Sequence, residues 1–352
     1  MLKPWRDFNF SYFYSFPKYM TLARSSHVTV QPSSLLMRPI AALDAGNRTT
    51  QWVTPTGQVM TIPSVIKHLE PWEDTPEIDS ESVVIEVIDK DGNKTERFVM
   101  GAEAQVQKGT PAFEVNKVEL AKHFIYAALE PSGRQNTVVI ECLRIALPDA
   151  RHTENFALLK ELEGVYEFIR NGQRIYTSVR HVEPVDETRS AYRYAVRNGL
   201  FKSPKSVNGI LDLGGGTGIG RLYSPNGSLN RQADVIVPGT YALAEKIDAA
   251  LLPTTGFSQN LSLIMDAIAS GSFTIGTSGI SFAHLFEKCR DAWLAEIRGK
   301  LRTKWGQYFS EIGEVLIVGG SAPLATPIQS ATNGRFKVAP SPQTISIKGM
   351  ML

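Results

Sequence analysis

The chain has 352 residues, 43% of them apolar and 20% charged, which is the composition of an ordinary soluble globular protein with the length of two domains. The net charge of +2 is unevenly spread, because residues 1–38 carry a net +4 and the rest of the chain −2. The rest of the chain has no excess of basic residues, which argues against direct nucleic-acid binding through many phosphate contacts.

Residues 1–38 combine basic side chains with eight aromatic ones and lack the aliphatic segment and cleavage site of a signal peptide. Two interpretations stay open. One is an anchor at a membrane surface or a filament contact, since aromatic and basic residues together suit a membrane interface. The other, which we favour, is an extension outside the fold, because Met37 directly precedes the first strand.

The first lobe is predicted over residues 39–200. It opens with an apolar strand at 40–43, a polar glycine-containing turn at 44–50 and a second strand at 51–53. Residues 66–101 are predicted to be an inserted element whose hairpin pairs 83–88 with 97–100. A helix at 117–129, a buried strand at 137–146, a helix at 153–162, a hairpin at 166–179 and a helix at 187–197 follow.

The second lobe, predicted over residues 201–352, begins as the first did. A strand at 207–211 enters the turn Asp212-Leu-Gly-Gly-Gly-Thr-Gly, and Asp44 and Asp212 are 168 residues apart, the spacing of two lobes of similar size. Helices are predicted at 241–251, 260–269 and 282–308, followed by a strand at 315–318 and a helix start at 321–323. We expect the C-terminal segment to return to the first lobe.

Three glycine turns therefore follow strand ends, at Asp44, at Asp212 and at Gly319. Glycine lets the backbone approach an anion, because no Cβ blocks the converging N–H groups. A carboxylate beside such a turn repels phosphate unless a cation lies between them, so Asp44 and Asp212 imply Mg²⁺, which takes oxygen ligands. One glycine turn alone would be an ordinary tight turn, whereas three in this order indicate a phosphate site.

The remaining ligand-type residues carry weaker patterns. Cys142 and Cys289 lie far apart in apolar contexts, which predicts core thiols in a reducing compartment, the cytoplasm. The six histidines lack a spacing such as HExxH and are predicted to be structural or surface residues, so no metal other than Mg²⁺ is implied. No run approaches the ~18 consecutive apolar residues of a membrane span.

The sequence resembles a known superfamily at these turns. Asp44-Ala-Gly-Asn-Arg-Thr-Thr is similar to the phosphate-1 loop, Asp212-Leu-Gly-Gly-Gly-Thr to the phosphate-2 loop and Ile317-Val-Gly-Gly-Ser to the adenosine motif of the actin, sugar kinase and heat-shock chaperone ATPases. Softer matches, at 62–66, 99–104 and 342–350 with Gly349, resemble bacterial and archaeal actin-like proteins of the ParM and Alp kind. This implies an α/β actin-like fold of two related ribonuclease-H-like domains with a nucleotide cleft between them.

The resemblance also implies roles for single residues. Asp44 and Asp212 would hold Mg²⁺ through water, and Glu187 would orient the water that attacks the γ-phosphate. The residues implied to bind ATP, with GTP as the alternative, are Gly46, Asn47, Arg48, Thr49, Gly214, Gly215, Gly216, Thr217, Gly319, Gly320 and Ser321. For Glu187 two alternatives stay open: that Asp186 is the true match, and that Glu187 is a solvated first-turn residue favoured by the helix dipole.

One departure from the family pattern concerns the end of the first loop. Many members have a lysine where this chain has Gln51, so a β-phosphate contact is missing or supplied elsewhere. Arg48 is one source of that charge, although Arg and Lys differ in geometry. Ser190 and Ala191 resemble the small residues that let the helices connecting the two lobes pack closely.

We therefore expect a filament-forming actin-like ATPase that self-associates through 66–101 and 252–280 and positions plasmid DNA through an adaptor protein. The first alternative is a small-molecule phosphotransferase, which requires an acceptor base that no clear motif supplies. The second is a membrane-associated relative for cell shape or pilus assembly, anchored by its N-terminus.

Overall fold

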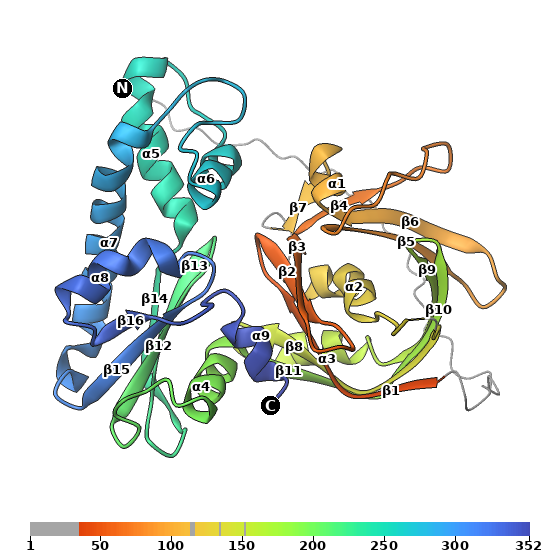
Figure 1. Cartoon of the computed structure of the whole chain (residues 1–352), viewed down its shortest axis with the longest axis horizontal. Coiled ribbons are helices and arrows are strands. Elements are labelled where there is room, and N and C mark those ends of the chain that lie inside the picture. Colours follow the sequence, from red (N-terminus) through yellow and green to blue (C-terminus); the bar gives the residue numbers. More distant parts are fainter. Residues whose placement is uncertain (1–34, 113–116, 134, 151–152) are drawn as a thin grey trace, which may run out of the picture.

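The computed structural model of the chain describes residues 35–112, 117–133, 135–150 and 153–352, and the expectations for residues 1–34 lie outside these ranges. Two lobes stand side by side, and each is built on its own β-sheet (Figure 1). Among the described residues, no helix has both the length and the apolar character needed to cross a bilayer.

The first lobe holds an eleven-stranded sheet whose order is β3-β2-β1-β8-β10-β9-β5-β6-β4-β7, with β11 also paired to β8. Its strands are β1 (Leu35–Ala45), β2 (Thr49–Val53), β3 (Val59–Pro63), β4 (Val65–His68), β5 (Ser82–Ile88), β6 (Lys94–Gly101), β7 (Thr110–Pro111), β8 (Thr137–Leu147), β9 (Gly164–Arg170), β10 (Gln173–Val179) and β11 (Val182–Asp186). Its helices are α1 (Ala102–Val106), α2 (Lys117–Ala128) and α3 (Thr153–Lys160). The sheet curls around α2 (Figure 1).

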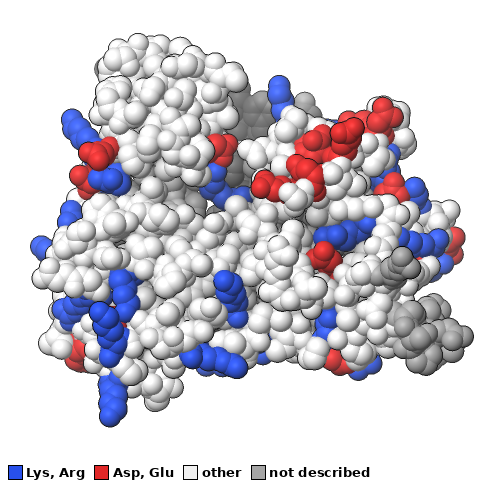
Figure 2. Space-filling model, in the orientation of Figure 1, with Lys and Arg blue, Asp and Glu red and all other residues white. Residues whose placement is uncertain are grey.

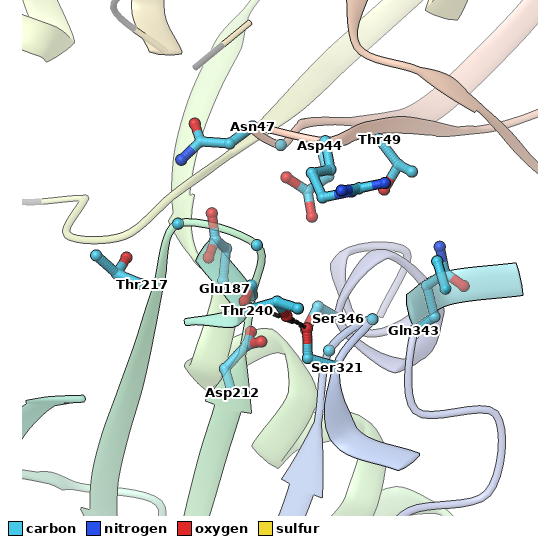
Figure 3. Close-up of a pocket in the computed structure, with 18 of the residues that line it drawn as sticks. Asp44, Asn47, Thr49, Glu187, Asp212, Thr217, Thr240, Ser321, Gln343 and Ser346 are labelled. Atoms are coloured by element: carbon cyan, nitrogen blue, oxygen red, sulfur yellow. Dashed lines mark hydrogen bonds between the residues drawn. The ribbon is translucent and has the colours of Figure 1, made fainter. Parts of the chain in front are cut away.

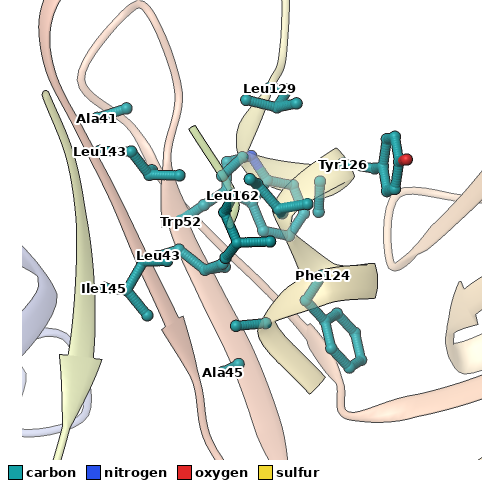
Figure 4. Close-up of a cluster of buried hydrophobic side chains, with 14 of the residues drawn as sticks. Ala41, Leu43, Ala45, Trp52, Phe124, Tyr126, Leu129, Leu143, Ile145 and Leu162 are labelled. Carbon is teal, nitrogen blue, oxygen red and sulfur yellow. The ribbon is translucent and has the colours of Figure 1, made fainter. Parts of the chain in front are cut away.

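The core of this lobe forms between the curled sheet and α2. Alternate residues of β1, among them Leu43, face α2 because side chains of a strand point to opposite faces in turn. Figure 4 shows Leu43 and Ile145 on the strands opposite Phe124 on the helix. Trp52, only 1% exposed, closes one end of this core and donates a hydrogen bond from Nε1 to Glu130 Oε2 at 2.9 Å.

Two features of the first lobe refine the predictions. The first strand begins at Leu35, so the expected boundary at residue 38 falls inside β1. Arg38 is buried there because its guanidinium donates to the carbonyls of Ala128 and Val53, at 2.9 and 2.6 Å. The predicted hairpin at 83–100 forms, with Val83 opposite Met100, and its strands continue the sheet by pairing with β9 and β4.

The second lobe repeats the strand pattern of the first on a five-stranded sheet, in the order β14-β13-β12-β15-β16. Its strands are β12 (Val207–Leu213), β13 (Thr217–Tyr223), β14 (Leu229–Pro238), β15 (Ile312–Val318) and β16 (Phe336–Val338). In both lobes a three-stranded antiparallel meander is followed by parallel strands: β12 pairs in parallel with β15 as β1 does with β8. The predicted duplication is thus present in the topology.

Helices cover both faces of the second sheet. In chain order they are α4 (Glu187–Arg197), α5 (Thr240–Thr255), α6 (Leu261–Ser270), α7 (Ala283–Trp305), the short 3₁₀ turns η3 (Gly306–Tyr308) and η4 (Ala322–Ala325), α8 (Thr326–Ala331) and α9 (Ile345–Met350). Leu211 and Leu213 of β12 pack toward α5, α6 and α7, whereas Ile210 packs toward α4. This two-sided burial explains the uninterrupted apolar run at 315–318 in β15, whose residues pack alternately on the two faces.

Helices α4 and α9 cross where the two lobes join. A Cβ on Gly349 of α9 would lie 2.0 Å from the carbonyl oxygen of Ser190 on α4, so the two backbones touch directly. Ile345 of α9 packs with α4, whereas Ile347 joins the first lobe beside Ala42. The C-terminal segment therefore contacts both lobes.

Candidate functional site

The same glycine turn is built at equivalent places in the two lobes. After β1, the Gly46 N–H donates to the Thr49 carbonyl at 3.1 Å, and after β12 the Gly214 N–H donates to the Thr217 carbonyl at 3.1 Å. In each turn a Cβ on the glycine would lie 2.8 Å from that same carbonyl oxygen. Only glycine fits either position, which is why both turns carry one two residues after an aspartate.

The two turns contact each other across the cleft. A Cβ on Gly215 would lie 2.8 Å from Cγ of Arg48, and one on Gly216 would lie 2.9 Å from Nδ2 of Asn47. The absence of side chains at these two glycines is what lets the turns approach. Between the lobes they border a cavity of about 430 Å³.

Every residue that the sequence singled out for the site, apart from Asp186 as the alternative to Glu187, lines this one cavity. Asp44, Glu187 and Asp212 are among them, together with Gly46, Asn47, Arg48, Thr49, Gly214, Gly215, Gly216, Thr217, Gly319, Gly320 and Ser321. The sequence reasoning missed the other lining residues apart from Gln51, namely Pro148, Ile219, Thr240, Met265, Ile268, Ala269, Pro323, Leu324, Gln343 and Ser346. Most of these lie in helices or their flanks, where no motif marks them.

Three carboxylates face this cavity. Figure 3 shows those of Asp44 and Asp212 pointing toward one another from opposite lobes, with Glu187 nearby at the start of α4. Each of the two aspartates precedes its glycine turn, so the chain duplication itself places them as a facing pair. Oxygen ligands on two sides of a cavity suit a hard divalent cation that keeps part of its water.

Asp186, the alternative to Glu187, is directed elsewhere. It is 6% exposed, and its carboxylate accepts hydrogen bonds from Ala150 N at 3.0 Å, Arg221 at 3.3 Å and Arg231 at 3.3 Å. Arg221 also donates to the Pro148 carbonyl at 2.8 Å. This network fastens the loop after β8 to the second sheet, so Asp186 supports the cavity from behind while Glu187 borders it.

The third glycine turn packs beneath the second. Gly319 has a φ of +90°, and a Cβ there would lie 2.4 Å from Asp212 Oδ1, so a side chain would collide with that carboxylate. Ser321 N donates to the Leu213 carbonyl at 3.0 Å, and the hydroxyls of Ser321 and Thr240 hydrogen-bond to each other. Apolar side chains from α6 and η4, at Met265, Ile268 and Leu324, also line the cavity, and they suit a flat apolar group.

Gln51 supplies an independent sign of a ligand. Its side chain is 3% exposed and lines the cavity, and its Nε2 has no hydrogen-bond partner. Burying an amide without a partner costs about 1–3 kcal/mol. A polar group of a ligand in the cavity would satisfy it, and Gln51 occupies the position where the family pattern has a lysine.

The guanidinium of Arg48 pairs with a side chain on the other side of the cleft. Its Nη2 lies 2.5 Å from Asp266 Oδ1 on α6, and Gln105 of α1 donates to the other oxygen of Asp266 at 3.3 Å. Two side chains of the first lobe thus hold one carboxylate of the second. The expected phosphate contact of the Arg48 side chain therefore competes with this ion pair.

Taken together, the cavity offers glycine-lined backbone, facing carboxylates, an unpaired amide and an apolar wall. Glycine turns suit the phosphates of a nucleotide, the carboxylates suit its magnesium ion, and the wall suits its base. These residues fit Mg²⁺-ATP, the cofactor that the motifs imply.

The comparisons with known proteins bear on the fold. No family model matches the chain, and no curated protein matches it by sequence. Solved structures do: the archaeal actin homologue Ta0583 has a TM-score of 0.72 at 15% identity, covering 89% of this chain and 97% of that one. The apo psk41 ParM protein has a TM-score of 0.65 at 16% identity, covering 90% and 96%.

Two further structures bear on ligands and assembly of the relatives. Ta0583 has also been solved in complex with ADP, with a TM-score of 0.69 at 14% identity over 89% of this chain and 97% of that one. A 15-stranded ParM filament from Clostridium botulinum has a TM-score of 0.71 at 15% identity over 90% and 98%. The chain therefore has the two-lobed actin-like fold of the ParM and Alp kind that its motifs predicted.

Proposed function

We propose that this chain is an actin-like ATPase that binds ATP with Mg²⁺ between its lobes and assembles into filaments. The observation that carries the nucleotide site is the duplicated turn: two aspartates, each followed by the same glycine turn, face one another across one cavity. The ADP complex of the archaeal actin homologue supports the choice of an adenine nucleotide over a guanine one.

Each part of the cavity has a role in this proposal. The backbone of the two glycine turns would bind the β- and γ-phosphates, and Asp44 and Asp212 would hold the hydrated Mg²⁺. The ion, when bound, neutralises charge that builds up on the transferred phosphoryl group. Glu187 would orient the attacking water by accepting its proton in a hydrogen bond, and the lobes would exclude bulk water.

Binding and hydrolysis can be tested apart. We expect Asp212→Ala to abolish Mg²⁺-dependent ATP binding, measured by fluorescent-nucleotide titration. Glu187→Gln is expected to keep ATP binding but to lower phosphate release by roughly 100-fold, the lower end of what general acid–base catalysis contributes. Glu245→Gln, an exposed residue of α5 outside the cavity, is the matched control. Unchanged binding in Asp212→Ala would refute this site.

Self-association is supported by two surfaces of opposite charge. The connection between β4 and β5 is exposed and acidic, with Glu70, Glu73, Asp74, Glu77, Asp79 and Glu81, and it carries Trp72 with 79% of its surface exposed. Figure 2 shows acidic side chains gathered over this part of the first lobe. An exposed tryptophan within a charged segment is typical of a protein contact.

The complementary surface is a groove along α4. Arg189, Arg193 and Arg197 are exposed, four residues apart on one helix face, and have no ion-pair partner among the described residues. With Tyr192 and Val196 they line a cavity of about 450 Å³. The β4 to β5 connection lies at the upper side of the first lobe, whereas α4 lies at the lower side of the molecule (Figure 1). A head-to-tail contact between two different surfaces generates a filament when the rotation between copies does not close into a ring.

Assembly can be measured by right-angle light scattering with Mg²⁺ and either ATP or a poorly hydrolysed analogue. We expect a rise that requires nucleotide and lasts longer with the analogue. Trp72→Ala and Arg193→Glu are expected to raise the critical concentration by about 30-fold, the effect of losing a contact of ~2 kcal/mol. Lys300→Glu on the outer helix α7 is the control. A flat trace with nucleotide bound would favour the alternative, a small-molecule phosphotransferase.

The cargo follows from the ParM resemblance. We propose that the filament acts in the cytoplasm and positions plasmid DNA through an adaptor protein, because the body of the chain carries a net −2 and does not suit direct DNA contact. Co-sedimentation of filaments with plasmid DNA, with and without the adaptor, tests this. Salt-sensitive DNA binding by the chain alone would contradict it.

A further inference from the structure

Three metal-ligand side chains meet in the first lobe, outside the nucleotide cavity. They are His68 at the end of β4, Glu96 on β6 and His123 on α2. His68 Nδ1 lies 3.2 Å from Glu96 Oε1, and His123 Nε2 lies 3.3 Å from the same oxygen. The three potential ligand atoms are all within 4.8 Å of one another. Their positions in the sequence form no recognisable motif, and only folding brings them together.

The separations match those of ligands around one ion. Zinc binds nitrogen and oxygen at about 2.1 Å, so two ligands at tetrahedral angles lie about 3.4 Å apart. Ordinary N–H···O hydrogen bonds are most often about 2.9–3.0 Å long. Both nitrogen-to-oxygen distances exceed that mode and approach the spacing of zinc ligands, so an ion could enter with little movement of the side chains.

The surroundings hold the two rings in place and leave one side open. Phe98 is fully buried and packs against both imidazoles, with ring centroids 5.9 Å from His68 and 5.3 Å from His123. The side chains of His68, Glu96 and His123 keep 56%, 36% and 29% of their surfaces exposed. A fourth ligand, water or a donor from another molecule, therefore has access.

The charge of the cluster suits a cation. The carboxylate of Glu96 offers an oxygen ligand, and the imidazoles of His68 and His123 offer two nitrogen ligands. Two nitrogens and one oxygen favour zinc over magnesium, which prefers oxygen ligands alone.

We propose that His68 Nδ1, His123 Nε2 and Glu96 Oε1 bind one Zn²⁺ ion, which ties the neighbouring strands β4 and β6 to α2. This site is separate from the proposed nucleotide site, since none of the three residues lines that cavity. The ion links two neighbouring strands of the curled sheet to the helix that the sheet encloses. It stabilises the first lobe whether or not ATP is bound.

The test uses the full chain, treated with EDTA, dialysed and titrated with ZnCl₂ by calorimetry without nucleotide. We expect one strong site in the unmodified protein. His68→Ala and His123→Ala should each weaken it by at least about tenfold. His181→Ala is the matched control, because His181 Nδ1 lies 3.2 Å from Glu163 Oε1 without a second imidazole. Zinc affinity that is unchanged in both His68→Ala and His123→Ala would overturn the proposal.

A second measurement needs no variant and covers the case in which a substitution unfolds the lobe. Zn²⁺ should raise the melting temperature of the unmodified protein, because an ion that binds only the folded state stabilises it. Co²⁺ in its place should give the visible absorption of a four-coordinate site. A melting temperature that does not respond to zinc, or cobalt absorption typical of the free hydrated ion, would refute the site.

Discussion

Arg48 and Asp266 offer the sharpest test of how the cleft works. The resemblance gives Arg48 a place at the phosphates, whereas the structure pairs its guanidinium with Asp266 at 2.5 Å. The side chains are 29% and 38% exposed, and ion pairs of this exposure contribute about 0.2–1 kcal/mol. If Arg48 acts only by holding the lobes together, its loss can weaken ATP binding by about fivefold at most.

We therefore expect Arg48→Ala and Asp266→Ala to weaken Mg²⁺-ATP binding equally, each by fivefold or less, and the double variant to be no weaker than either single one. The difference in ATP affinity between these variants and the unmodified protein should shrink at high salt, because exposed charges are screened. Fluorescent-nucleotide titration measures the ATP affinity of the two single variants and of the double variant. Arg180→Ala, whose pair with Glu141 is also exposed, controls for loss of a surface ion pair.

The opposite result has a clear form. A hydrogen bond from Arg48 to a phosphate would be charge-assisted and contribute about 1.5–3 kcal/mol, a factor of roughly 10 to 150 in affinity. Arg48→Ala would then weaken binding far more than Asp266→Ala. Asp266→Ala would even tighten it by releasing the guanidinium. Either finding would refute the cross-lobe role and return Arg48 to the phosphate site.

Three further predictions follow from single contacts. Gly349→Ala should lower the free energy of unfolding by about 1–3 kcal/mol in urea titrations, because its Cβ would lie 2.0 Å from the Ser190 carbonyl; an unchanged midpoint would contradict the close crossing. Gln51→Leu should stabilise the nucleotide-free protein and weaken ATP binding by about tenfold, since it removes a buried unpaired amide. A substitution that changes the stability of the nucleotide-free protein and the affinity for ATP in the same direction would refute the role of Gln51 as a ligand. In EDTA, Glu96 should stabilise the protein above pH about 4.5 and lose this effect as the pH falls toward its folded pKa of about 2. The difference in free energy of unfolding between the unmodified protein and Glu96→Gln should therefore shrink over that pH range. A difference that stays constant in urea titrations would contradict this prediction.

The glycine turns were predictable because the constraint there is local. Only glycine tolerates the approach of the Thr49 and Thr217 carbonyls. The sequence must therefore have glycine at both positions, and an aspartate at the end of the preceding strand completes the pattern. The helices α4 and α7 were predictable for a similar reason, since helical spacing of apolar residues is visible in a single segment.

Other parts depend on contacts between distant segments and left no such mark. Strand β13 was not predicted, because Gly218 and Gly220 make its sequence resemble a loop. These glycines are required by packing, since a Cβ would lie 2.7 Å from Val237 and Val235 respectively. Arg38 resembled the end of a solvated extension and is instead buried in β1. The His68, Glu96 and His123 cluster joins three elements and was equally invisible.

The crossing of α4 and α9 sets the mechanics of the whole molecule. With the two backbones in direct contact at Ser190 and Gly349, a swing of one lobe against the other turns about that point as about a pivot. Displacement grows with distance from a pivot, and α1 and α6 lie on the far side of the cleft (Figure 1). A pair of spin labels on those two helices would therefore report a small rotation at the joint as a larger change in distance than labels placed beside the joint.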